Sequence, residues 1–105
     1  MNTTSLGEEI QKLLPESKVV KTLNIVNCEV MVKPQKSGGD PTMFISGNHA
    51  EAKEKVKALL DQFGWTDIID LGDITTARGT EMLLPIWLRT YMATGNGYFG
   101  FKIIR

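Results

Sequence analysis

A segment near the carboxyl terminus has the glycine spacing of a phosphate-binding loop. The segment is GNGYFG, residues 95–100, and it matches GxGxxG, a pattern in which glycines let the backbone approach a pyrophosphate. That chemistry also needs a strand before the segment, a helix opening at its third glycine, and an acidic residue about 20 positions later. Only five residues follow Gly100. We therefore interpret the segment as a flexible turn and not as a nucleotide-binding loop.

Residues able to perform acid–base or metal chemistry are few and scattered. His49 is the only histidine and Cys28 the only cysteine, so the sequence contains no cluster with the spacing of metal ligands. Asp70 and Asp73 are close enough in sequence to act as an acid and a base, but helix capping explains Asp73 without chemistry. We predict no catalytic residue and no metal ligand. We expect Cys28 to be a small buried hydrophobic residue.

Length and charge limit the class of protein. With 105 residues, the chain is one domain or a piece of one. Its 12 basic and 12 acidic residues give a net charge of zero, without a basic run that would attract a nucleic acid or a membrane surface. The polar start MNTTSLGEEI lacks the apolar run of a signal peptide, and no stretch approaches the ~20 apolar residues of a membrane span. We expect a cytoplasmic protein with no nucleic-acid and no membrane partner.

The clearest structural signals lie in residues 42–73, which predict a strand, a helix and a strand. Residues 42–46 and 67–71 are β-prone runs. Asn48, with a glutamate three residues later, has the spacing of a capping box, and Gly64 stands where a left-handed C-cap belongs. The apolar stripe of the helix consists of Ala52, Val56, Leu59, Leu60 and Phe63. Such a unit is typical of layered α/β domains.

Before this unit, the sequence predicts a helix, a strand and a helical turn. Ser5 caps a helix that ends before Pro15. The apolar face of this helix consists of Leu6, Ile10, Leu13 and Leu14. Residues 18–26 are apolar enough for a strand covered on both faces. Residues 27–33 are interpreted as a helical turn, and residues 34–41 as a loop.

After this unit, the sequence predicts a helix that Pro85 kinks or restarts. Asp73 or Thr75 can cap its start, and Arg78 and Glu81 are spaced for a local pair. Its second part is apolar nearly all round, through Leu83, Leu84, Ile86, Trp87, Leu88, Tyr91 and Met92. Two interpretations stay open: a surface for a missing domain or a second copy of this chain, or an ordinary core helix. We expect the β-prone carboxyl-terminal end to be extended.

Three stretches of the chain carry a resemblance to a known family. They are SLGEEIQKLLPESKVVKTLNIVN, DPTMFISGNHAEAKEKVKALLDQFGWTDIIDLGDITTARGTEMLLPIWLR and FKIIR. Over nearly the whole chain, they resemble the C-terminal half of the NADP oxidoreductase, coenzyme F-420-dependent family, whose members transfer a hydride between NADP and a deazaflavin. The NADP-binding domain of the six-transmembrane metalloreductases is similar over the same stretch.

The resemblance implies an α/β fold. Residues 1–105 would form a single partial domain, the C-terminal half of a Rossmann-like three-layer sandwich. We expect a short parallel or mixed sheet of about three strands with two or three flanking helices. The family's other half, whose glycine loop holds the pyrophosphate of NADP, is absent, so we expect a truncated protein or an isolated fragment. Without that loop, we expect no tight cofactor binding by this chain alone.

The resemblance also implies site residues. Asn24 matches the asparagine that ends a strand beside the nicotinamide, where its amide can bond the carboxamide, and ligands of open α/β sheets sit at such strand ends. Thr22 and Leu23 match the same strand, although the family commonly has an aromatic residue in place of this leucine. Arg78 matches an Ala-Arg step of the family, where it is either structural or substrate-facing.

These implications combine into a functional prediction. We predict the C-terminal portion of an NADP-dependent, deazaflavin-type oxidoreductase, which contributes the nicotinamide side of the site and an oligomer surface and is inactive alone. Its partner would be the missing N-terminal Rossmann half or a second copy of the chain, the latter giving a homo-oligomer. The alternative is a non-enzymatic α/β module for interaction or dimerisation.

Overall fold

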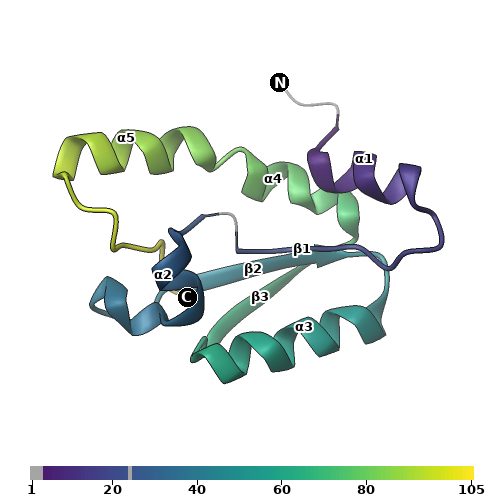
Figure 1. Cartoon of the computed structure of the whole chain (residues 1–105), viewed down its shortest axis with the longest axis horizontal. Coiled ribbons are helices and arrows are strands. Elements are labelled where there is room, and N and C mark those ends of the chain that lie inside the picture. Colours follow the sequence, from purple (N-terminus) through teal and green to yellow (C-terminus); the bar gives the residue numbers. More distant parts are fainter. Residues whose placement is uncertain (1–3, 24) are drawn as a thin grey trace.

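The computed structural model describes residues 4–23 and 25–105. Its strands are β1 (Val20–Lys21), β2 (Thr42–Gly47) and β3 (Asp67–Gly72). Its helices are α1 (Leu6–Leu13), α2 (Cys28–Val32), α3 (Ala50–Phe63), α4 (Ala77–Glu81) and α5 (Leu84–Thr94), with the 3-10 turns η1 (Pro34–Ser37) and η2 (Ile74–Thr76). The sheet lies between α3 on one side and α1, α4 and α5 on the other (Figure 1). The predicted three-layer α/β architecture is confirmed, with more helices than expected.

The sheet is mixed, and β2 is its central strand. β1 pairs antiparallel with β2, so that Val20 faces Gly47. β3 pairs parallel with β2, starting with Thr42 opposite Asp67. The predicted strand–helix–strand unit is therefore confirmed as β2, α3 and β3. β1 lies beside the carboxyl end of β2, since Lys21 pairs with Ser46, and the chain after β1 runs toward the amino end of β2.

The hydrophobic core surrounds β2 and joins it to α2 and α3. Its buried members are Ile25, Val26, Val30, Met43, Ile45, Leu60 and Trp65. Gly64 ends α3 with a φ of 105°, the left-handed C-cap that the sequence predicts. This turn directs Trp65 inward, where its Nε1 donates to the carbonyl of Met31 at 2.8 Å. The bond satisfies the polar atom of a side chain that is only 1% exposed.

The start of α3 differs from the prediction. His49, and not Asn48, occupies the N-cap position, and its side chain forms no capping bond. The Oδ1 of Asn48 instead accepts a hydrogen bond from the backbone N–H of Ile74 at 2.9 Å. This bond ties the end of β2 to the first residue of η2. The capping-box interpretation was wrong because a long-range donor holds the asparagine side chain.

The first strand is much shorter than the predicted residues 18–26. Only Val20–Lys21 belongs to the sheet, because Leu23 has a φ of 63° and turns the chain away. Ile25 and Val26 follow this turn and enter the core without joining the strand. The segment is rich in apolar residues because part of it is buried in the core. From sequence alone, such a segment cannot be distinguished from a buried strand.

The helical turn predicted at residues 27–33 is confirmed as α2. Asn27 caps it, with Oδ1 accepting from the N–H of Val30 at 2.9 Å. Cys28 is exposed, so its expected burial was wrong. It occupies the first position of the short helix, while Val30 turns into the core and is fully buried.

Helix α1 has the predicted cap but not the usual orientation of an amphipathic helix. Ser5 Oγ accepts from the N–H of Glu8 at 3.2 Å, which confirms the N-cap. The residues that this helix buries are Gly7 and Glu8. Its apolar face is exposed, with Leu6 at 61% and Leu13 at 79% of full exposure. α1 therefore contributes little apolar area to the core of the described chain.

Pro85 restarts the helix, as predicted, and separates α4 from α5. Asp73 caps η2 at the start of this region, through Oδ1 and the N–H of Thr75. α5 has no buried residue, which excludes the interpretation of an ordinary core helix. Its exposed apolar side chains are Leu84, Ile86, Leu88, Tyr91 and Met92.

The carboxyl-terminal residues 96–105 form neither a helix nor a strand. The carbonyl of Phe101 accepts from the N–H of Thr42 at 2.7 Å, and Thr42 Oγ1 accepts from the N–H of Ile103 at 2.9 Å. The segment therefore lies against the first residue of β2. Among the described residues, no helix has the length and hydropathy needed to cross a membrane.

Candidate functional site

The carboxyl end of β1 carries the residues predicted to meet a cofactor. Thr22 is half-buried and donates its hydroxyl hydrogen to the carbonyl of Phe44 at 2.7 Å, so its oxygen keeps only acceptor capacity. Leu23 packs against the core in a left-handed conformation that non-glycine residues rarely adopt. Asn24 lies outside the described residues. The structure thus places Thr22 and Leu23 at this strand end, and the cofactor role of all three residues stays a prediction.

The glycine-rich segment 95–100 packs against Asn27 and Pro41. Asn27 Nδ2 donates to the carbonyl of Gly97 at 2.8 Å. A Cβ added at Gly100 would lie 2.5 Å from Cβ of Pro41, a distance that carbon atoms do not tolerate. Glycine is required at position 100 because two segments approach closely there. Packing therefore explains the last glycine of the GxGxxG pattern.

An open pocket of about 450 Å³ lies between the chain after η1 and the carboxyl-terminal segment. Its lining consists of Ser37, Gly38, Gly39, Asp40, Pro41, Phe99, Gly100 and Lys102. The ammonium group of Lys102 is engaged, with Nζ 2.7 Å from Asp67 Oδ2 and 3.6 Å from Asp40 Oδ2. Sequence reasoning missed this pocket because its two walls are far apart in the chain and carry no local signal.

Asp67 anchors the carboxyl-terminal segment to the sheet. Arg105 Nη2 lies 2.9 Å from its Oδ1, and Oδ2 accepts from Thr42 Oγ1 at 2.6 Å as well as from Lys102. Hydrogen bonds from Arg105, Lys102 and Thr42 hold the pKa of this carboxyl far below its usual range, although burial opposes them. The carboxylate is thus strongly favoured as the charged form in the folded protein. Its position, at the amino end of β3, is next to the pocket.

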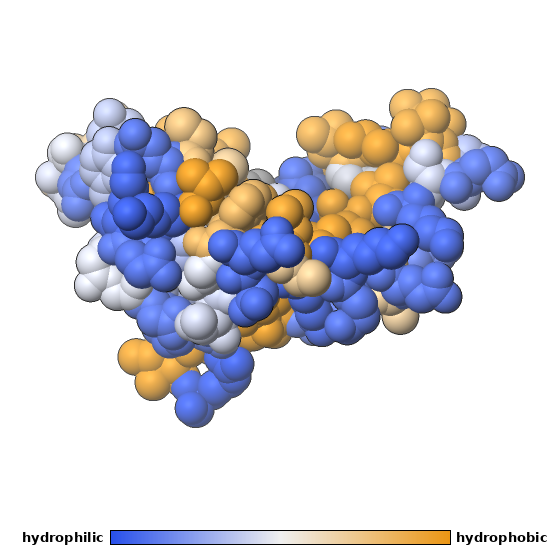
Figure 2. Space-filling view, turned by 60° about the horizontal axis from the view of Figure 1, so that its bottom comes forward, coloured by the Kyte–Doolittle hydropathy of each residue, from blue (hydrophilic) through white to orange (hydrophobic). Residues whose placement is uncertain are grey.

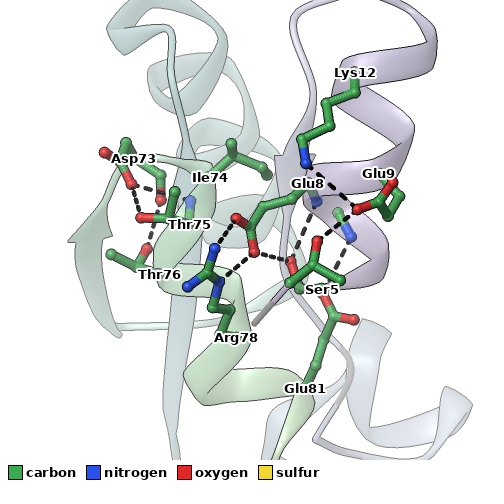
Figure 3. A network of polar contacts seen from close by, with 12 residues as sticks. Ser5, Glu8, Glu9, Lys12, Asp73, Ile74, Thr75, Thr76, Arg78 and Glu81 are labelled. Atoms are coloured by element: carbon green, nitrogen blue, oxygen red, sulfur yellow. Dashed lines mark hydrogen bonds and ion pairs between the residues drawn. The ribbon is translucent and has the colours of Figure 1, made fainter. Parts of the chain in front are cut away.

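Arg78 lies at the other end of the sheet, after the carboxyl end of β3. Its Nε and Nη2 donate to the two carboxylate oxygens of Glu8, each at 2.7 Å (Figure 3). The Arg78 hydrogen bond lowers the pKa of the Glu8 carboxyl against the effect of burial, and Glu8 raises the pKa of Arg78 in turn. A two-point pair of this kind fixes both side chains. The guanidinium is therefore engaged with Glu8, and a contact of Arg78 with substrate stays a prediction.

Glu81, the expected local partner of Arg78, has a different role. Its carboxylate accepts from the backbone N–H groups of Leu6 at 2.8 Å and Gly7 at 3.2 Å, so it caps α1 from a distant part of the sequence. The expectation of a local pair was wrong because free N–H groups at a helix start attract a carboxylate. Figure 3 shows Ser5, Glu8, Arg78 and Glu81 gathered at this junction of α1 and α4.

Asp70 and Asp73 do not form an acid–base pair. Burial raises the pKa of Asp70, but hydrogen bonds from Lys53 and from the N–H of Gly72 outweigh it and lower the pKa. Lys53 Nζ lies 3.0 Å from Asp70 Oδ2. Asp73 caps η2 through the N–H and hydroxyl of Thr75. Both carboxylates therefore have structural partners, and the described chain holds no cluster of three or more His, Cys, Asp or Glu suited to a metal ion.

The predicted site residues lie in separate parts of the fold: Thr22 and Leu23 follow β1, whereas Arg78 belongs to α4. A pyrophosphate needs an open glycine loop at a helix start. Gly47, which precedes α3, is instead packed so that an added Cβ would lie 2.9 Å from the carbonyl oxygen of Val19. Among the described residues, the start of α3 therefore offers no open glycine loop for a pyrophosphate.

Two known proteins are similar to this chain. The F420-dependent NADP reductase of Methanocaldococcus jannaschii is 30% identical over 96 residues, a match that covers 89% of this chain and 43% of that protein. The crystal structure of a proposed F420-dependent NADP reductase from Arthrobacter sp. FB24 superimposes with a TM-score of 0.97 at 57% identity. It covers 100% of this chain, which covers 48% of that one. No protein-family model matches the chain.

The chain spans less than half the length of either relative. The match to the solved structure extends over every element of the fold. At 57% identity, the two chains share most of their residues as well as their fold. The resemblance predicted from the sequence is therefore confirmed: this chain is a relative of the F420-dependent NADP reductases and corresponds to the C-terminal half of that family.

Proposed function

We propose that this chain is the part of an NADP-dependent, deazaflavin-type oxidoreductase that forms the nicotinamide side of the active site. The observation that carries the proposal is the match to the Arthrobacter reductase over 100% of this chain at 57% identity. Thr22, Leu23 and Asn24 would border the nicotinamide, with the Asn24 amide bonding its carboxamide. The bound nicotinamide would supply the hydride, and the residues of this chain would orient the ring and exclude water from it.

The proposed part does not act alone. The groove for the pyrophosphate would come from the remaining half, because the described residues of this chain offer no open glycine loop at a helix start. Catalysis and tight NADP binding would therefore require the other half, either in the same polypeptide or as a separate chain.

A fusion protein tests this proposal. The part of the Arthrobacter reductase that this chain does not match is joined to the chain in the order found in that relative. We expect the fusion to oxidise NADPH with a deazaflavin acceptor. The variant Asn24→Ala should raise the KM for NADPH at least about tenfold, the effect of losing a hydrogen bond of roughly 1.4 kcal/mol. Gly39→Ala, in an exposed loop, is the control. A fusion that binds no NADPH would contradict the proposal.

The proposal includes an oligomer surface on α5. This helix exposes its apolar side chains, and Trp87 stacks on Phe99 with ring centres 5.3 Å apart. The indole Nε1 of Trp87 is buried and has no hydrogen-bond partner among the described residues. We infer that a second copy of the chain covers α5 through Ile86, Trp87 and Tyr91. Light scattering should show a dimer that Ile86→Glu dissociates, whereas a monomer at high concentration would exclude this surface.

A non-enzymatic interaction module is the alternative, and the exposed α5 is the observation that favours it. The two proposals differ in one outcome of the fusion experiment. An oxidoreductase part turns over NADPH once it is joined to the other half, whereas an interaction module dimerises but leaves NADPH unchanged.

A further inference from the structure

Helix capping and packing explain two of the three glycines in the segment 95–100. Gly95 ends α5 with a φ of 68°, and Gly100 lies where two segments approach closely. Gly97 has neither role, because its φ is not positive and an added Cβ would lie no closer than 3.4 Å to an atom outside the adjoining residues. Since Gly97 has no side chain, its backbone nitrogen is accessible to the side chain of the preceding residue, Asn96.

The side chain of Asn96 is exposed and is held at one atom only. Its Oδ1 accepts a hydrogen bond from the N–H of Tyr98 at 2.8 Å, the arrangement of an Asx turn. Within the described chain, no hydrogen bond involves Asn96 Nδ2 or the N–H of Gly97. On the face shown in Figure 2, hydrophilic and weakly polar residues cover most of the left side, which is the side where α5 ends in Figure 1. Water therefore has access to both the side-chain amide and the next peptide nitrogen.

This arrangement suits a reaction between the side-chain amide and the next backbone nitrogen. Once hydroxide removes the proton from the N–H of Gly97, the nitrogen can attack Cγ of Asn96. Negative charge then develops on Asn96 Oδ1, the atom to which the N–H of Tyr98 already donates, as a donor of an oxyanion hole does. The two reacting atoms belong to adjacent residues, so the reaction needs no encounter between molecules.

We propose that Asn96 and Gly97 form a site of spontaneous deamidation, at which Asn96 is converted through a succinimide into aspartate and isoaspartate. The new bond joins Gly97 N to Asn96 Cγ, the bond from Cγ to Nδ2 breaks, and Nδ2 leaves as ammonia after taking a proton from water. Water then adds to one of the two carbonyl carbons of the ring. Opening at Cγ gives aspartate, whereas opening at the backbone carbonyl carbon leaves the chain running through the side chain, as isoaspartate. No electrons are transferred, since one water is consumed and one ammonia is released.

The modification changes the link between α5 and the carboxyl-terminal segment. Both products carry a negative charge where the chain had a neutral amide. Isoaspartate also adds a carbon atom to the backbone directly before Gly97. The carbonyl of Gly97 accepts a hydrogen bond from Asn27 Nδ2 at 2.8 Å, so the longer backbone displaces one partner of this bond. We therefore expect isoaspartate to weaken the contact between this segment and the start of α2.

Mass spectrometry of the digested protein tests the site. The 105-residue chain is incubated at neutral pH for several days in water enriched in heavy oxygen. Asn27 and Asn48 are internal controls, because each precedes a residue with a side chain, Cys28 or His49. We expect Asn96 to be converted at least about tenfold faster than either control, with an oxygen atom from the solvent in the product. Equal rates at the three asparagines would overturn the proposal.

Gly97→Ala is the matched variant. Its Cβ would lie 3.4 Å from Asn27 Nδ2, a distance that the fold accommodates, and it would shield the attacking nitrogen. We expect deamidation of Asn96 to be at least about tenfold slower in Gly97→Ala than in the unchanged chain and in Gly39→Ala, the control. Equal rates in the three proteins would contradict the proposed attack.

The products separate the proposed route from direct hydrolysis of the side-chain amide. Direct attack of water on Cγ gives aspartate alone, whereas a succinimide gives isoaspartate as well. The probe is an enzyme that methylates isoaspartyl groups. We expect it to label residue 96 of the incubated chain and not the freshly prepared chain. Converted protein that contains aspartate but no isoaspartate would overturn the proposal.

Discussion

Gly100 offers a sharp test of why the segment 95–100 is rich in glycine. A Cβ added there would lie 2.5 Å from Cβ and 3.1 Å from Cγ of Pro41. Gly100 is not among the residues with positive φ, so the effect of Gly100→Ala is steric and not conformational. Because carbon atoms pack at about 3.5–4.0 Å, the carboxyl-terminal segment or the loop at Pro41 would have to move by roughly 1 Å.

The expected magnitude follows from this overlap. Overpacking of a closely fitted contact costs about 1–3 kcal/mol. A loss of about 1 kcal/mol lowers the Tm of a domain of this size by about 4–8 °C. We therefore expect Gly100→Ala to lower the Tm by at least about 4 °C, measured by thermal unfolding followed through circular dichroism. Gly39→Ala is the matched control, because nothing lies within 4 Å of the added Cβ, and its Tm should be unchanged or slightly higher.

A double variant separates the contact from other effects. Pro41→Gly removes both contacted carbon atoms, so Gly100→Ala should cost less stability in that background than in the unchanged protein. If Gly100→Ala keeps the Tm of the Gly39→Ala control, the packing explanation of this glycine is refuted.

Three further predictions concern the polar contacts. The pKa of Asp67 is lowered, chiefly by Arg105, so the stability that this carboxylate gives is present above about pH 4 and is lost as the pH falls below it. In Asp67→Asn, the free energy of unfolding should therefore depend less on pH in this range. An unchanged pH dependence would contradict the anchoring role of Asp67. Arg78→Met should speed hydrogen exchange in α1, whereas Arg78→Lys should do so less; equal exchange in all three proteins would rule out the clamp. Asn48→Ala should lower the free energy of unfolding by about 1 kcal/mol and Asn48→Asp, which keeps the acceptor, by less; equal losses would contradict the assigned bond.

The parts of the fold that sequence predicted are those with local causes. β2, α3 and β3 follow from β-prone runs, one apolar stripe and the left-handed turn at Gly64, all within a few residues of each other. The restart at Pro85 is equally local, since a proline ring blocks the preceding turn. The limits of β1 were not predictable, because the turn at Leu23 depends on how Ile25 enters the core.

The contacts that define the candidate sites are long-range, and the sequence does not encode them in spacing. Glu8 meets Arg78 across 70 positions, and Asp67 meets Arg105 across 38. The spacing of Arg78 and Glu81 predicted an ion pair between them, because spacing considers only neighbours on one helix. The role of Asn24 came from family resemblance alone, and this residue lies outside those that the structure describes.

The central proposal is that the described residues of this chain form the nicotinamide side of an NADP site and offer no cradle for the pyrophosphate. Calorimetric titration of the 105-residue chain with NADPH tests it most directly. A missing pyrophosphate cradle removes the charge-assisted hydrogen bonds that supply most of the binding free energy. We predict no binding tighter than about 1 mM, equivalent to about −4.1 kcal/mol. Micromolar binding by the chain alone would contradict this account.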